Sequence, residues 1–211
     1  MKVFFSICCG FLLSLLFRYL LHLFPDASQE ETIYLADLSK THKRRLQQSY
    51  LSLANHLQDS RRAYFSLEIS LGGILMITRI GWISPIHCYL LLFSLLFSLF
   101  DWRSQEYPFP LWLVTFVSLL LFYPINHTSL LLLLLGLLAY FRPFSIGSGD
   151  FLYLASLALV FDSMSLIWLI QLACLVGIIA CLLLRVRRIP FIPYLTFGLL
   201  CIVFLEKYLS N

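Results

Sequence analysis

Long apolar stretches separated by short polar or proline-bearing breaks run through most of the chain. Eight of them predict membrane-spanning helices, at 3–24, 64–80, 84–100, 108–124, 127–141, 150–165, 166–184 and 190–207. A spanning helix needs roughly 20 apolar residues, and fewer beside a cavity or in a thinned bilayer. The fifth and sixth stretches are short, and the boundary at 165 is marked only by Asp162-Ser163. The pattern predicts an all-α protein with about eight transmembrane helices.

Composition supports a polytopic integral membrane protein. The 211 residues are 60% hydrophobic and only 12% charged, whereas a soluble domain carries roughly 25% charged residues. The first stretch has a second interpretation, a signal peptide with Lys2 as its basic start. Arg18 and His22 interrupt that stretch, and no convincing small-residue cleavage site follows it. We therefore predict a first transmembrane helix.

The basic residues fix an expected orientation, because cytoplasmic connections are enriched in Lys and Arg. With the N-terminus outside, only Lys2, Arg79 and Lys207 face outward. The other twelve face the cytoplasm: Arg18, Lys40, Lys43, Arg44, Arg45, Arg61, Arg62, Arg103, Arg142, Arg185, Arg187 and Arg188. The predicted organisation is a first helix at 1–24, a cytoplasmic loop at 25–63 and a transmembrane bundle at 64–211. Within the loop, 41–58 fits either an amphipathic surface helix or a solvated connection.

Two aspartates are candidates for chemistry, since ionisable residues at hydrocarbon are expensive. Asp101 follows the apolar run 90–100, where the helix macrodipole disfavours a negative charge. Its structural alternative is an interfacial carboxylate paired with Arg103. Asp150 follows Gly147-Ser148-Gly149, where the glycines allow a sharp bend and close approach to a ligand. Its structural alternative is an N-cap after a glycine turn.

The count of helices puts the two aspartates on one side of the membrane. Asp101 ends the third predicted helix and Asp150 begins the sixth, with two complete spans between them. If the carboxyl groups approach closely, one stays protonated as general acid while the other activates water. The sequence therefore predicts an aspartic hydrolase with a cytoplasmic site. Asp162, in contrast, reads as an ordinary turn-forming residue on the outer side.

Nothing in the sequence indicates a cofactor, a metal site or a nucleic-acid partner. The six cysteines form no Cys-x-x-Cys pair, which argues against a structural zinc site of the usual spacing. P-loop, Ser–His and His-Glu zinc-helix patterns are also missing from the sequence. The carboxylates thus carry the functional interpretation.

Three ordered stretches resemble the type IV prepilin peptidases, membrane aspartyl proteases of the GxGD kind. They are Phe100-Asp101-Trp102-Arg103-Ser104-Gln105-Glu106-Tyr107-Pro108, Gly147-Ser148-Gly149-Asp150, and Ile189-Pro190-Phe191-Ile192-Pro193-Tyr194-Leu195. The resemblance implies Asp101 and Asp150 as catalytic residues, with Gly147, Gly149 and Glu68 near the substrate. The implied substrates are pilin-like precursors with a basic leader, cut at the cytoplasmic face of a bacterial cell membrane.

The chain departs from the family in its loop. Many members carry two Cys-x-x-Cys pairs there, and this loop has no cysteine. The shortened form resembles versions from Gram-positive competence systems, in which the substrates are pseudopilins. It also argues against the N-methylation activity of larger members. The lysine often found two residues after the GxGD aspartate is replaced by Leu152.

Glu68 keeps two interpretations: an ion pair with Arg61, Arg62 or Arg142, or a residue lining the substrate path. Two other protein classes remain open for the chain. A small transporter or channel component would use the same carboxylates for protons or cations, although it would want them near the bilayer midplane. A non-catalytic assembly protein of a pilus or secretion machine would tolerate loss of either aspartate.

Overall fold

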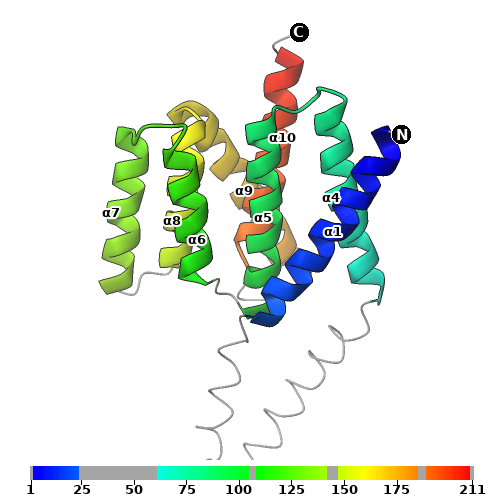
Figure 1. The fold of residues 1–211 in the computed structure, drawn as a ribbon. Helices are drawn as coiled ribbons and strands as arrows, with labels where there is room; N and C mark the ends of the chain where they lie inside the picture. Colours follow the sequence, from blue (N-terminus) through cyan, green and yellow to red (C-terminus); the bar gives the residue numbers. More distant parts are fainter. Residues whose placement is uncertain (1, 24–60, 105–107, 142–146, 185–188, 210–211) are drawn as a thin grey trace, which may run out of the picture. The chain divides into compact units, whose positions relative to one another are not determined.

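The structure, a computed structural model, describes residues 2–23, 61–104, 108–141, 147–184 and 189–209. Throughout these ranges the regular structure is helical, which confirms the all-α prediction for this part of the chain (Figure 1). The helices are α1 (Lys2–Leu23), α4 (Arg61–Arg79), α5 (Pro85–Ser104), α6 (Phe109–Leu120), α7 (His127–Phe141), α8 (Ser148–Val160), α9 (Ser163–Leu184) and α10 (Ile192–Leu209). The possible surface helix at 41–58 lies outside the described residues.

Helix boundaries match the hydrophobic pattern to within a few residues, except between α8 and α9. The predicted boundary at 165 is wrong, because α8 ends at Val160 and α9 begins at Ser163. Asp162 explains the shift: its carboxylate accepts hydrogen bonds from the backbone N–H groups of Met164 (3.3 Å) and Ser165 (3.4 Å). A side-chain acceptor at this position starts a helix immediately after it. The interpretation of Asp162 as a turn residue is confirmed.

Within the described ranges, two helices are long and apolar enough to cross a membrane, Pro85–Trp102 within α5 and Ser163–Leu183 within α9. Four other apolar helical stretches are shorter, at Cys8–Leu21, Phe109–Leu120, His127–Phe141 and Ser148–Val160. At about 1.5 Å per residue, α6 with 12 residues and α8 with 13 rise only about 20 Å. A hydrocarbon core of about 30 Å exceeds that length.

The chain divides into two compact units, Met1–Gly81 and Trp82–Asn211. In the first unit α1 packs against α4. The two backbones approach closely at Gly10, where an added Cβ would lie 2.9 Å from the backbone of Gly72. The chain leaves α4 through Gly81, whose φ of 86° is in the left-handed region that favours glycine.

The second unit is built around α8. Every residue from Tyr153 to Leu159 is buried, and α8 packs against α6, α7 and α9. Helix α10 packs against both α5 and α9. At the last contact Gly198 allows close approach, since an added Cβ would lie 2.8 Å from the Leu169 carbonyl oxygen.

Polar side chains from α6, α7 and the connection between them fasten α8 through its backbone carbonyls. Trp112 donates its Nε1 hydrogen to the Leu152 carbonyl (2.8 Å), and Ser129 donates to the Ala155 carbonyl (2.9 Å). The Asn126 amide donates to the Ala158 carbonyl. These acceptors are three residues apart and therefore lie along one face of α8. Hydrogen bonds distributed along the helix in this way resist its sliding along its own axis as well as its separation from α6 and α7.

Candidate active site

Asp101 lies in the last turn of α5 and is buried, with 6% of its surface exposed. Its Oδ2 accepts a hydrogen bond of 2.9 Å from the backbone N–H of Ile192, the first residue of α10. The neighbouring N–H of Phe191 also bonds to the carboxyl group. The unsatisfied N–H groups and the positive dipole end of α10 therefore face Asp101. This offsets the unfavourable dipole of α5, whereas the sequence alone indicated only the dipole of α5. The predicted alternative partner, the Arg103 side chain, lies outside the described residues.

Asp150 is the third residue of α8 and is partly buried. The N-cap position is held by Gly147, so the alternative in which Asp150 itself is the N-cap is wrong. The backbone N–H of Gly147 bonds to the Asp150 carboxyl group. A carboxylate in the first helical turn that reaches back to the N-cap N–H is stabilised by the macrodipole.

The expected sharp bend at the glycines is not what the structure shows. Gly147 has φ −64° and ψ 142°, an extended conformation open to any residue, and Gly149 lies inside α8. A Cβ added to Gly147 would lie 3.5 Å from Oδ2 of Asp150, an ordinary van der Waals distance. The contribution of Gly147 is therefore open space beside the carboxylate, and backbone freedom is not required at this position.

The two aspartates lie close enough for the charge on Asp101 to act on Asp150. They come from different helices, at the end of the second unit where α5 finishes and α8 and α10 begin (Figure 1). Two neighbouring carboxyl groups in a water-poor site favour a state that holds one proton between them. Such a pair can supply a general acid and a general base together.

Buried hydroxyl groups one helical turn from the aspartates were not predicted from the sequence. They belong to Ser94, Ser98, Tyr153 and Thr196, which bond to one another between α5, α8 and α10. A signal was present, because Ser94, Ser98 and Asp101 recur at helical spacing on α5. The sequence could not reveal that α8 and α10 place hydroxyls against the same face.

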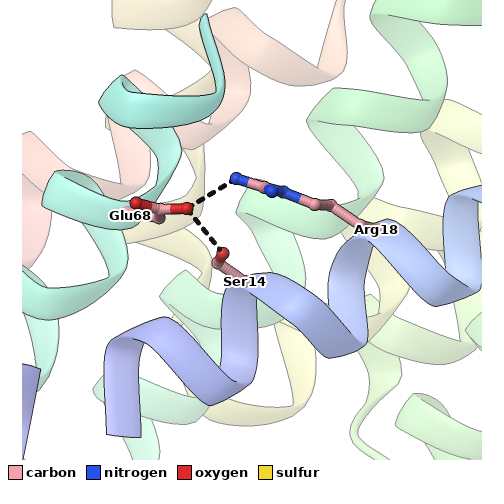
Figure 2. A network of polar contacts seen from close by, with 3 residues as sticks. All are labelled: Ser14, Arg18 and Glu68. Atoms are coloured by element: carbon pink, nitrogen blue, oxygen red, sulfur yellow. Dashed lines mark hydrogen bonds and ion pairs between the residues drawn. The ribbon is translucent and has the colours of Figure 1, made fainter. Parts of the chain in front are cut away.

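Glu68 lies in the first unit, and its partner is Arg18 (Figure 2). Arg18 Nη2 donates to Glu68 Oε1 at 2.5 Å, and the Ser14 hydroxyl donates to the same oxygen at 3.4 Å. The ion pair joins α1 to α4, close to the tight contact of Gly10 with Gly72. An ion pair was one predicted interpretation, but Arg18 was not among the partners predicted for it. The first unit thus holds Glu68 and the second holds both aspartates.

The other end of the second unit carries a different set of ionisable groups. His87 stacks on Phe161 with ring centroids 5.3 Å apart, and its Nε2 lies 3.9 Å from Oε2 of Glu206. The exposed Asp162 lies in the neighbouring turn, and its hydrogen bonds with Ser165 hold the pKa of its carboxyl group below the ordinary value. These groups take part in local packing and capping.

Comparison with known proteins gave no assignment: no family model matches this chain, and neither a curated protein nor a solved structure matches it significantly. The functional interpretation therefore depends on the residues themselves.

Proposed function

We propose that this protein is a membrane aspartic endopeptidase that removes the basic leader from type IV prepilins or pseudopilins. The observation that carries the proposal is that Asp101 and Asp150, from separate helices, lie at one end of the second unit, close enough for their charges to interact. The resemblance of the three ordered stretches to prepilin peptidases supplies the substrate class.

In the proposed reaction one carboxylate takes a proton from water, whose oxygen attacks the scissile carbonyl carbon. The protonated carboxyl hydrogen-bonds to the carbonyl oxygen as negative charge develops there. Collapse of the tetrahedral intermediate breaks the C–N bond, and the leaving amine takes up a proton from the pair. The bonds from Phe191 and Ile192 orient Asp101 for these transfers. This chemistry needs neither a metal nor a covalent intermediate.

The proposed topology has eight membrane spans, the N-terminus outside and the site at the cytoplasmic face. It is supported by the twelve-to-three division of basic residues. The short α6, α7 and α8 would require a thinned bilayer or cover from longer neighbours. A prepilin has its leader on the cytoplasmic side and its apolar helix in the membrane, so a scissile bond between them would reach this level.

A cleavage assay tests the proposal. The full chain is co-expressed with a pseudopilin precursor, and leader loss is followed by gel shift and mass spectrometry. Asp101→Asn and Asp150→Asn are assayed beside Asp162→Asn, which makes the same chemical change at an exposed capping aspartate of the same unit. We expect cleavage by the parent and by Asp162→Asn, and no cleavage detectable by gel shift in the other two variants at equal membrane levels.

Two results would contradict the proposal. Cleavage that survives in both Asp101→Asn and Asp150→Asn would remove the aspartate pair from the mechanism. A parent that cleaves none of several prepilin and pseudopilin precursors would shift the interpretation to a transporter component or a non-catalytic assembly protein.

A further inference from the structure

Four buried hydroxyl groups form what we call the hydroxyl cluster: Ser94 and Ser98 on α5, Tyr153 on α8, and Thr196 on α10. Tyr153 is 2% exposed and packs edge-on against Phe97, with ring centroids 6.0 Å apart. Buried hydroxyls are costly unless they are hydrogen-bonded. All four make such bonds, and three of the six bonds cross between helices.

One branch of the hydroxyl cluster joins α8 to α5 in a fixed direction. The Tyr153 hydroxyl donates to Ser94 Oγ at 2.6 Å, and Ser94 donates in turn to the Leu90 carbonyl at 2.6 Å. Each hydroxyl has a single proton, so this order uses both donors fully. If Ser94 donated to Tyr153 instead, it would lose its hydrogen bond to the Leu90 carbonyl. The direction of the Tyr153–Ser94 hydrogen bond is therefore fixed.

The second branch joins α5 to α10. Ser98 and Thr196 have their hydroxyl oxygens 2.7 Å apart. Both also reach the Ser94 carbonyl, Ser98 at 2.7 Å and Thr196 at 3.2 Å. Thr196 lies 2.9 Å from the Ile192 carbonyl as well. The two side chains therefore bridge α5 and α10 around the carbonyl of Ser94.

The hydroxyl cluster lies one helical turn behind the groups of the aspartate pair. Along the sequence, Ser98 precedes Asp101 by three residues and Tyr153 follows Asp150 by three. Thr196 follows Ile192, the backbone donor to Asp101, by four. Residues three or four apart share one face of a helix. Each of the three helices thus presents a site group and a hydroxyl on the same face.

We propose that Tyr153 is a positioning residue, which acts through the hydroxyl cluster to set the separation of Asp101 and Asp150. This inference rests on the proposed function, because it assigns the separation a role in peptide cleavage. Tyr153 is the member that ties α8 to the α5–α10 pair, and α8 carries Asp150. Loss of its hydroxyl would remove the hydrogen bond from α8 to α5, while the hydrogen bonds from the α6–α7 side would stay.

The decisive variant is Tyr153→Phe, with Tyr89→Phe as its matched control. Tyr89 also shares a hydrogen bond between its hydroxyl and a serine, Ser118, but between α5 and α6. Small misplacements of reacting groups cost up to about a hundredfold in rate. For a purified pseudopilin precursor we expect kcat to fall about tenfold in Tyr153→Phe with KM unchanged, and to stay within about twofold in Tyr89→Phe.

A second readout does not depend on activity. Asp101→Cys and Asp150→Cys are combined in a full-length chain whose six native cysteines have been replaced. A short bis-methanethiosulfonate reagent then reports how often the two positions come within its span. Tyr153→Phe is expected to slow cross-linking several-fold, whereas Tyr89→Phe leaves it unchanged. This measurement decides the inference even if the parent cleaves no precursor.

Thr196 provides a second pair of variants if Tyr153→Phe fails to fold. Thr196→Val removes the hydroxyl with little change in shape, and Thr196→Ser keeps it. We expect Thr196→Val to lower kcat and slow cross-linking, and Thr196→Ser to restore both. Equal effects in Tyr153→Phe and Tyr89→Phe, or in Thr196→Val and Thr196→Ser, would overturn the inference, because the hydroxyls would then serve stability alone.

Discussion

The second unit carries an aspartate before and another after the buried body of α8, in opposite surroundings. Asp162 is exposed, and its carboxylate is used up in capping the next helix. Asp150 is partly buried beside a second carboxyl group, Asp101, which is itself held by the start of α10. The first unit offers a third case, since Glu68 is neutralised by Arg18. A carboxylate stays available for proton transfer where its neighbours orient it without neutralising its charge.

The largest expected effect is loss of either member of the aspartate pair. Asp101→Asn and Asp150→Asn should each lower the cleavage rate about a thousandfold, as expected for loss of a general acid or base. The double variant should be no slower than either single variant, because the two groups act as a unit. Initial rates of cleavage in isolated membranes measure these losses. A double variant whose loss equals the product of the two single losses would contradict a shared role.

The ion pair of the first unit should act on stability. Arg18→Met leaves Glu68 without its guanidinium, and Glu68→Met does the converse. Both side chains are partly exposed, at 34% and 24%, so removing one partner should cost less than it does in a fully buried ion pair. We expect each single change to cost about 2 kcal/mol. The double variant should recover most of that loss in a thermal-unfolding assay in detergent.

The same double variant tests Glu68 as a substrate-binding residue. Normal KM for a pseudopilin precursor would leave Glu68 with a structural role only. A KM raised in the double variant, with stability recovered, would instead support its predicted place in the substrate path.

Packing beneath α10 should give an intermediate effect. Gly198→Ala would bring a Cβ to 2.8 Å from the Leu169 carbonyl oxygen, and overpacking of this kind costs about 1–3 kcal/mol. Gly177→Ala is the matched control, since its nearest contact would be 3.6 Å. Both variants gain the same helix propensity, so the difference between their unfolding temperatures isolates the contact. Equal temperatures would contradict the close approach of α9 and α10.

The smallest effect is expected at Asp162. Its folded-state pKa lies below the ordinary 3.8, so its contribution to stability is present above that value and declines as the pH falls further. Asp162→Ala should cost less than about 1 kcal/mol at neutral pH, because the group is exposed. Unfolding temperatures of parent and variant should converge below pH 3.8. A constant difference at all pH values would rule out the carboxylate as the cause.

Much of the fold was predictable because each helix corresponds to one apolar stretch of sequence that ends at a turn residue or a charge. The stretch at 127–141 coincides with α7, Pro85 is the first residue of α5, and Pro108 immediately precedes α6. The boundary at Asp162 was misplaced because the residues around it are apolar enough to continue a helix. A single capping side chain decides that position, and hydropathy does not register it.

The site was predictable only in part. Asp101 and Asp150 could be selected because charge is rare in apolar sequence. Their partners could not, since Ile192 contributes a backbone N–H group, which every residue but proline possesses. Arg18 was likewise missed as the partner of Glu68, because that contact depends on how α1 crosses α4.

The bond between Asp101 and Ile192 has a consequence for biosynthesis. Chains emerge from the ribosome N-terminus first, so Trp112, Asn126 and Ser129 are made before the helix that they fasten. The start of α10, in contrast, is made after α5 to α9. A nascent chain can therefore assemble α5 to α8 early, yet Asp101 receives its backbone donor only once the start of α10 has been made. On the proposed function, cleavage activity would then arise only after α10 has been made.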